Sequence, residues 1–92
     1  MKNEIKLTTK ELAEEIEKGR KKISIGSKYT HYKNPSHKYT VLDLAIQEAT
    51  NKVCVIYKAD YVTGITFIRD LDVWLSKPTI NGKKVNRFTK VT

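Results

Sequence analysis

The chain has few cysteines, prolines and glycines, and each shortage excludes a class of protein. A single cysteine in 92 residues cannot close an internal disulfide, so this is not a disulfide-stapled secreted domain. Two prolines and four glycines leave no low-complexity tract or linker. The longest apolar run, residues 53–57, is far shorter than the roughly 20 residues of a membrane-spanning helix. The first residues lack the apolar stretch of a secretory signal, so we expect a cytoplasmic protein.

Acidic residues are also scarce relative to basic ones. Eighteen Lys and Arg face ten Asp and Glu, which gives a net charge of +8, and most of the excess lies in residues 23–92. A positive field of this size favours an anionic partner, such as nucleic acid, a nucleotide-like small molecule or an acidic protein. Excess lysine also maintains solubility in many small domains, so charge alone does not decide between these roles.

A helix is predicted over about residues 9–18 by its start and stop signals. Thr8 and Glu11 have the spacing of a capping box, in which each side chain accepts the backbone N–H of the other residue. Gly19 is the residue type that commonly follows the last turn of a helix. The apolar positions of the helix share one side: Leu12, Ala13 and Ile16. A helix this short is not stable alone, so this stripe must dock on the domain or on a second copy of the chain.

From residue 23 onward the apolar pattern becomes that of short strands. Alternation places Leu42, Leu44 and Ile46 on one face of a strand, and residues 52–58 are apolar on both faces, as in an interior strand. Asp70 is placed to cap a single helical turn, and Asn81-Gly82 is a strong hairpin signal. The predicted extended segments are 23–32, 38–46, 52–58, 65–69, 79–80 and 83–88, with a loop at 33–37.

These elements predict a mainly β fold with one N-terminal helix. Short strands joined by tight turns favour a small, strongly bent antiparallel sheet or a partly open β-barrel. A chain of this length forms one thin-cored domain, because it buries only about 65% of the surface that its unfolded chain exposes. We therefore expect a single domain over residues 1–92, with a helical extension at 1–22 and the β-barrel at 23–92.

The sequence offers little for catalysis or metal binding. His31, His37 and Cys54 are too few for a metal site, and Cys54 lies in the middle of a predicted strand, where it fills the core. The carboxylates of Asp70 and Asp72 are better explained as helix-capping groups than as cation ligands. No serine or cysteine has an obvious base nearby. We therefore expect no enzyme activity, no metal and no cofactor.

Aromatic and basic residues gather instead at the ends of predicted strands. Aromatic rings stack on bases, and the planar fork of an arginine suits a phosphate or carboxylate group. We expect one concave pocket lined by His31, Lys33, Tyr57, Tyr61 and Arg69. The wider set of candidate ligand-binding residues adds Tyr29, Tyr32 and Lys58. Tyr39 and Trp74 are expected to pack in the core.

These residues also resemble those of a known family. The pattern consists of Gly26-x-x-Tyr29-x-His31-Tyr32-Lys33, Tyr39-x-Val41-Leu42, Val53-x-Val55-x-Tyr57-Lys58, Tyr61, Arg69 and Val85-x-Arg87-Phe88. Over roughly residues 24–91 it is similar to the domain-of-unknown-function family numbered 1653, small bacterial and phage proteins. The resemblance implies a compact barrel like that of Src-homology-3 folds and implies no activity. Val62-Thr63 replaces the usual Gly-Asp of the family, and Phe67 replaces the usual Trp.

Three functions remain open at this point. The first is a non-enzymatic binding protein for a phosphate-bearing, nucleotide-like small molecule, which in a phage would sequester a host defence signal. The second is a nucleic-acid-binding β-barrel, which uses the same basic and aromatic residues. The third is a protein-interaction module for acidic or proline-rich segments. A homo-oligomer that completes a shared pocket is compatible with each, and no membrane association is expected.

Overall fold

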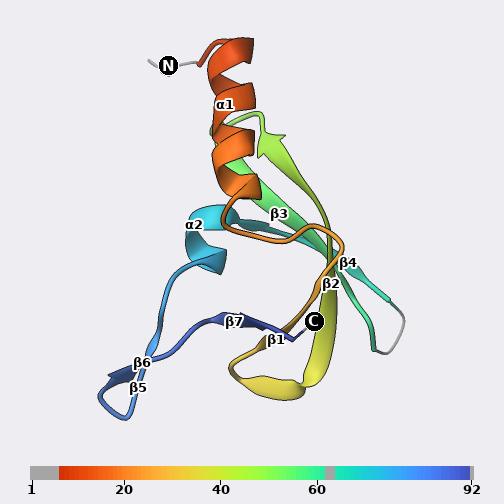
Figure 1. Ribbon diagram of the computed structural model, residues 1–92, viewed down its shortest axis with the longest axis vertical. Helices are drawn as coiled ribbons and strands as arrows, with labels where there is room; N and C mark the ends of the chain where they lie inside the picture. Colours follow the sequence, from red (N-terminus) through yellow and green to blue (C-terminus); the bar gives the residue numbers. More distant parts are fainter. Residues whose placement is uncertain (1–6, 62–63, 92) are drawn as a thin grey trace.

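The computed structural model describes residues 7–61 and 64–91 (Figure 1). The elements in order are α1 (Thr9–Arg20), β1 (Lys28–His31), β2 (Asn34–Gln47), β3 (Lys52–Ala59), β4 (Thr66–Asp70), α2 (Leu71–Trp74), β5 (Thr79–Ile80), β6 (Lys83–Lys84) and β7 (Phe88–Lys90). In these segments no helix is long and apolar enough to cross a membrane.

Five strands form one antiparallel sheet in the order β4-β3-β2-β1-β7, and β5 and β6 form a separate hairpin. The mainly β fold with one N-terminal helix is therefore confirmed, as is the interior position of the strand predicted at 52–58. The sheet stays open and is not closed into a barrel. α1 packs on β2 and β3, and α2 packs on β3 and β4, so both helices lie over one end of the sheet (Figure 1).

The predicted capping box at the start of α1 is confirmed. The backbone N–H of Glu11 donates to Thr8 Oγ1 at 3.1 Å, and the N–H of Thr8 donates to Glu11 Oε1 at 2.8 Å. The predicted stop is wrong, because the helix continues through Gly19 to Arg20. Gly19 is buried inside the helix, where an added Cβ would lie 2.9 Å from Leu44 Cδ1. The glycine is needed for this close approach of helix to sheet rather than for ending the helix.

The long strand β2 departs from the prediction in two ways. The expected loop at 33–37 is only a turn at residues 32–33, and β2 begins at Asn34. A β-bulge then shifts the register against β3 between Val41 and Asp43. The predicted common face of Leu42 and Leu44 is therefore wrong: Leu42 is 43% exposed and Leu44 is 5% exposed. A bulge inserts one residue into the strand, so the inward-facing positions change parity beyond it.

The core fills the face of the sheet that the helices cover. Its buried members come from every strand of the sheet except β4, and from both helices or their flanks. They are Ile23, Tyr29, Val41, Leu44, Val55, Tyr57, Leu71, Trp74 and Phe88, with Ile16, Tyr39 and Val53 packed against them. The predicted docking of α1 through its apolar stripe is thus confirmed for Ile16, and the expected core position of Trp74 is confirmed as well.

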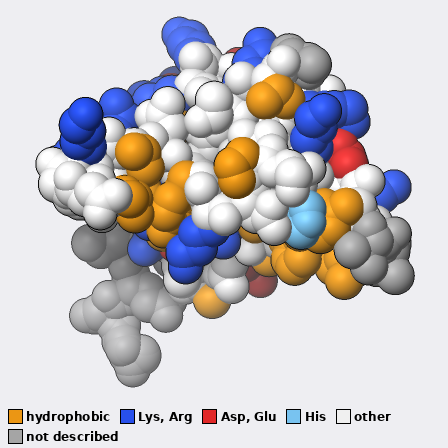
Figure 2. Space-filling view, turned by 90° about the horizontal axis from the view of Figure 1, so that it is seen from below, with side chains coloured by type: hydrophobic (Ala, Val, Ile, Leu, Met, Phe, Trp, Pro, Cys, Tyr) orange, Lys and Arg blue, Asp and Glu red, His pale blue; other side chains and the backbone are white. Residues whose placement is uncertain are grey.

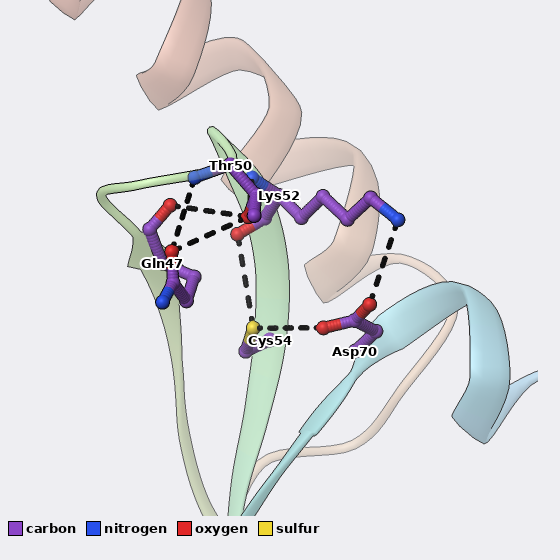
Figure 3. A network of polar contacts seen from close by, with 5 residues as sticks. All are labelled: Gln47, Thr50, Lys52, Cys54 and Asp70. Atoms are coloured by element: carbon purple, nitrogen blue, oxygen red, sulfur yellow. Dashed lines mark hydrogen bonds and ion pairs between the residues drawn. The ribbon is translucent and has the colours of Figure 1, made fainter.

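The segment around Asp70 corrects another detail. Asp70 precedes α2, but its side chain makes no capping hydrogen bond. Its carboxylate instead accepts from Cys54 Sγ at 3.5 Å and pairs with Lys52 at 3.6 Å (Figure 3). Burial, followed by the hydrogen bond to Asp70, raises the pKa of the Cys54 thiol. The thiol is therefore an inert core group, as expected.

The predicted hairpin at Asn81-Gly82 is confirmed. Asn81 has φ 51° and Gly82 has φ 80°, which is the pair of positive values that a two-residue hairpin turn requires. The strand predicted at 83–88 is divided, because β6 ends at Lys84 and β7 begins at Phe88. β7 then pairs with β1 at the edge of the main sheet, while the hairpin projects away from it (Figure 1).

Candidate ligand-binding site

The candidate site lies on the core face of the sheet, beside α2, whose Trp74 contacts Tyr57 and Phe88. Register places Tyr57 opposite Phe67 and His31 opposite Phe88, and residues paired across strands share a face. Arg69 is two residues after Phe67, so strand alternation brings it to the same face. Four strands, β1, β3, β4 and β7, therefore contribute to one surface.

The ring of Phe88 joins three of the predicted site residues. Its centroid lies 4.9 Å from the His31 ring and 5.8 Å from the Tyr57 ring, and the Arg69 guanidinium carbon lies 5.4 Å above it. Arg69 Nε also donates a hydrogen bond to Tyr57 Oη at 3.3 Å. The other face of Phe88 stacks on Trp74 at 3.6 Å, which fixes the ring in the core. Among residues 7–61 and 64–91, no hydrogen bond involves the two terminal nitrogens of Arg69, which suit a planar, paired contact with an oxyanion.

Positive charge is concentrated around His31. Burial, followed by the charges of Arg69, Arg87 and Lys33, lowers the pKa of His31 below its usual 6.5. None of these three cations forms an ion pair with a carboxylate within residues 7–61 and 64–91. Arg87 Nε instead donates to the neutral hydroxyl of Ser76 at 2.9 Å. We refer to His31, Lys33, Arg69 and Arg87 as the cation cluster.

The imidazole of His31 is held in one orientation by a backbone contact. The N–H of Lys33 donates to His31 Nδ1 at 3.2 Å, so Nδ1 accepts and the neutral ring carries its proton on Nε2. The ring also contacts the Tyr32 ring at a centroid distance of 4.7 Å. Even in its neutral form, His31 therefore presents an N–H donor beside the three cations.

A groove opens next to the cation cluster, between the β1–β2 turn and the β5–β6 hairpin. It has a volume of about 390 Å³ and is lined by Tyr32, Lys33, Ile80 and Val85. The guanidinium of Arg87 lies 5.7 Å from the Tyr32 ring centroid, so the apolar groove and the cation cluster adjoin. From below, this end of the molecule shows hydrophobic side chains beside lysine and arginine, with far more blue than red (Figure 2).

Tyr61 belongs to an aromatic extension of the site rather than to the cation cluster. Its hydroxyl lies 2.7 Å from Tyr39 Oη, and its ring stacks on His37 at 3.9 Å. Burial, followed by the hydrogen bond to Tyr61, raises the pKa of Tyr39 to about 12. Tyr39 in turn contacts Phe88 at 6.2 Å. Tyr61 is thus linked to the cluster through Tyr39, which is partly buried and packs against the core, as expected.

Two of the predicted residues lie apart from this surface. Tyr29 is 7% exposed, and its hydroxyl accepts a hydrogen bond from the Ser24 N–H at 2.9 Å. Lys58 is exposed and opposes Thr40 and Thr66 in register, on the face opposite to Tyr57. The structure therefore brings together His31, Tyr32, Lys33, Tyr57 and Arg69, attaches Tyr61 through Tyr39, and separates Tyr29 and Lys58.

Sequence reasoning missed Arg87, Phe88 and the two apolar residues of the groove, Ile80 and Val85. A signal for part of this set was present, because Val85-x-Arg87-Phe88 is one of the matching motifs. In the sequence this motif was interpreted only as part of the last strand of the family fold. The structure places Arg87 near His31 and Phe88 beneath the guanidinium of Arg69. As for metals, no group of three or more suitable ligand side chains occurs in the part of the chain that the structure describes.

Comparison with known proteins agrees with this fold. The model of a family described as "Protein of unknown function (DUF1653)" matches residues 27–90, which include all the strands and exclude α1. The crystal structure of a DUF1653 protein from Bordetella bronchiseptica is similar to this chain, with a TM-score of 0.62 and 29% sequence identity. The similarity covers 72% of this chain and 85% of that one. No curated protein matches the chain.

Proposed function

This chain belongs to the DUF1653 family of proteins of unknown function, and we propose that it is a non-enzymatic binding protein for a phosphate-bearing, nucleotide-like small molecule. The proposed site combines the cation cluster with the adjoining groove. In this arrangement the phosphate lies among the cations, and the base-like ring lies in the groove. A protein that binds such a molecule without reacting with it would lower the free concentration of that molecule. If the chain is a phage protein, the bound molecule would be a host defence signal.

The observation that supports this proposal most strongly is the uncompensated charge around His31. Lys33, Arg69 and Arg87 all lower the pKa of His31, which means that their charges reach the same small region. Like charges in one place destabilise the ligand-free protein, and within the described segments no carboxylate offsets them. An oxyanion between them would remove this repulsion and accept hydrogen bonds from the arginines and from His31 Nε2.

The groove supports a ring-bearing ligand over a bare anion. Tyr32 offers an aromatic face, and Ile80 and Val85 offer apolar contact from the hairpin opposite. Stacking of a base on an aromatic side chain contributes about 1–3 kcal/mol in single-stranded nucleic acid complexes. A volume of about 390 Å³ lies within the usual range for small-molecule sites, roughly 300–1,000 Å³.

The composition of the site favours binding over catalysis. Its charged groups are cations, and no carboxylate contacts His31 in the described part of the chain. The Nδ1 atom of His31 accepts the Lys33 N–H, so it carries no carboxylate partner of the kind found in a catalytic triad. These groups can grip an anion, and they do not form a nucleophile and base pair.

The proposal is tested by calorimetric titration with ATP, AMP and adenosine. We expect both nucleotides to bind and adenosine, which lacks phosphate, to bind at least tenfold more weakly. Arg69→Ala removes two charge-assisted hydrogen bonds, a loss of about 3 kcal/mol or roughly 150-fold in affinity. Arg69→Lys should weaken binding nearly as much, because lysine cannot present a paired fork. Arg20→Ala is the matched control, since Arg20 lies on α1 and pairs with Glu17.

Equal binding of adenosine and AMP, or equal losses in Arg69→Ala and Arg20→Ala, would overturn this function. Nucleic acid is the second candidate, favoured by the exposed Lys83 and Lys84 of the hairpin beside the groove. The salt dependence separates the two, because neutralising many phosphates makes affinity fall steeply with salt, whereas a site with few charge contacts gives a shallow dependence. Submicromolar, steeply salt-dependent binding of oligonucleotides would favour the second candidate.

A further inference from the structure

A second cavity lies between α2 and β7, on the other side of Arg87 from the groove. Its volume is about 210 Å³. Its floor is formed by Trp74 and Phe88, whose rings stack at 3.6 Å and are parallel within 3°. Its polar lining consists of Lys22, Lys77, Asn86, Arg87 and the buried Tyr29, whose hydroxyl already accepts the Ser24 N–H. We call this cavity the α2–β7 pocket.

The polar groups of the α2–β7 pocket are mostly hydrogen-bond donors. Lys22, Lys77 and Arg87 carry positive charge and only donate, and the lining residues that the structure describes include no carboxylate. Among residues 7–61 and 64–91, neither Lys22 nor Lys77 forms an ion pair. A concave site with several donors and no carboxylate is complementary to an acceptor-rich anion.

Trp74 supplies an independent observation. Its side chain is 3% exposed, and its indole N–H is a donor that usually finds a partner when it is buried. The contacts of Trp74 within the described residues are ring contacts with Tyr29, Tyr57 and Phe88, and its N–H donates to none of those residues. A buried donor without an acceptor is unusual in a folded protein, and it commonly marks a place where water or a ligand supplies the acceptor.

We propose that the α2–β7 pocket binds a phosphate-like, doubly charged oxyanion. Lys22 from the segment after α1, Lys77 from the segment after α2, and Arg87 before β7 surround the anion with charge. The stacked rings of Trp74 and Phe88 form the apolar wall of the site, and the buried Trp74 N–H is the nearby donor that the bound anion would accept from. This site is separate from the cation cluster, and of that cluster it shares only Arg87. The proposal does not depend on the nucleotide-like ligand.

The single tryptophan of the chain reports on this pocket directly. Inorganic phosphate is titrated against sodium chloride of equal ionic strength, with the fluorescence and the indole ¹H–¹⁵N resonance of Trp74 as readouts. We expect a saturable change with phosphate and with sulfate, and none with chloride. Acetate, which carries one charge, should bind at least fivefold more weakly than phosphate.

Matched variants assign the change to the pocket. Lys22→Gln and Lys77→Gln should each weaken phosphate binding at least fivefold, and both positions are exposed enough to substitute without loss of folding. Lys21→Gln changes a neighbouring lysine outside the pocket and should stay within twofold of the original affinity. Arg69→Ala, which disables the cation cluster, should leave the phosphate response of Trp74 intact, so the two sites can fail separately. A response that is absent, is equal in chloride, or is unaffected by both pocket variants would overturn the proposal.

Discussion

Replacement of Gly19 by alanine tests how closely α1 packs on the sheet. Two effects of opposite sign act at this position. Alanine stabilises a helix relative to glycine by about 0.5–1 kcal/mol. The added Cβ, however, would lie 2.9 Å from Leu44 Cδ1 and 3.1 Å from Leu71 Cδ2, which is inside normal contact distance. Both leucines are buried in the core, so they cannot move away without disturbing their neighbours.

Overpacking a filled core costs about 1–3 kcal/mol, which exceeds the gain in helix propensity. Gly19→Ala should therefore lower the free energy of unfolding by up to about 2 kcal/mol, although the same change in an exposed helix would raise it. Leu44→Val removes the Cδ1 atom that makes the closest contact. In that background Gly19→Ala should become neutral or stabilising, with a coupling energy of about 1–2 kcal/mol between the two positions.

Urea unfolding, followed by Trp74 fluorescence and by circular dichroism at the helix band, measures all four proteins of this cycle. Coincident transitions from the two probes would justify the use of two-state free energies. If Gly19→Ala stabilises the original protein by about 1 kcal/mol, or if the coupling is below about 0.3 kcal/mol, the close packing of α1 against Leu44 is refuted.

Two further predictions concern the site and the sheet. Because the pKa of His31 is lowered in the folded chain, the unfolded state takes up a proton first, so the stability of the ligand-free protein should decrease as the pH falls below 6.5. A bound phosphate would raise the pKa of His31 again, so nucleotide affinity should increase as the pH falls through the same range. In calorimetry, His31→Gln should weaken the pH dependence of both the stability and the nucleotide affinity. At the bulge, Leu44→Ala should cost about 2–4 kcal/mol by cavity formation, whereas Leu42→Ala should cost less than about 1 kcal/mol because Leu42 faces outward. Equal costs in urea unfolding would contradict the shifted register.

The elements that the sequence predicted correctly depend on residues close to one another along the chain. The capping box needs only Thr8 and Glu11 within one turn, and the hairpin needs only the positive φ values that Asn81 and Gly82 tolerate. The apolar run at 52–58 likewise predicts an interior strand, because only a strand flanked on both sides can bury it. Part of the site followed in the same way: His31, Tyr32 and Lys33 are neighbours in sequence and remain neighbours in the structure.

Other features depend on which distant residues meet, and local patterns carry no information about that. Gly19 has the ordinary appearance of a helix stop, and only the approach of Leu44 and Leu71 makes it a packing position within the helix. Leu42 follows a regular alternation, and only pairing with β3 reveals the bulge that turns it outward.

The length and composition of the sequence thus determined that the protein is small and basic, and its apolar pattern and local signals determined that it is mainly β and where several elements begin and end. The tertiary structure decided which charges share one place. Arg87 and Arg69 come beside His31 only because β7 pairs with β1 and the ring of Phe88 reaches Arg69. Coulomb interactions depend on distance in space and not on separation in sequence, so this concentration of positive charge is a property of the fold.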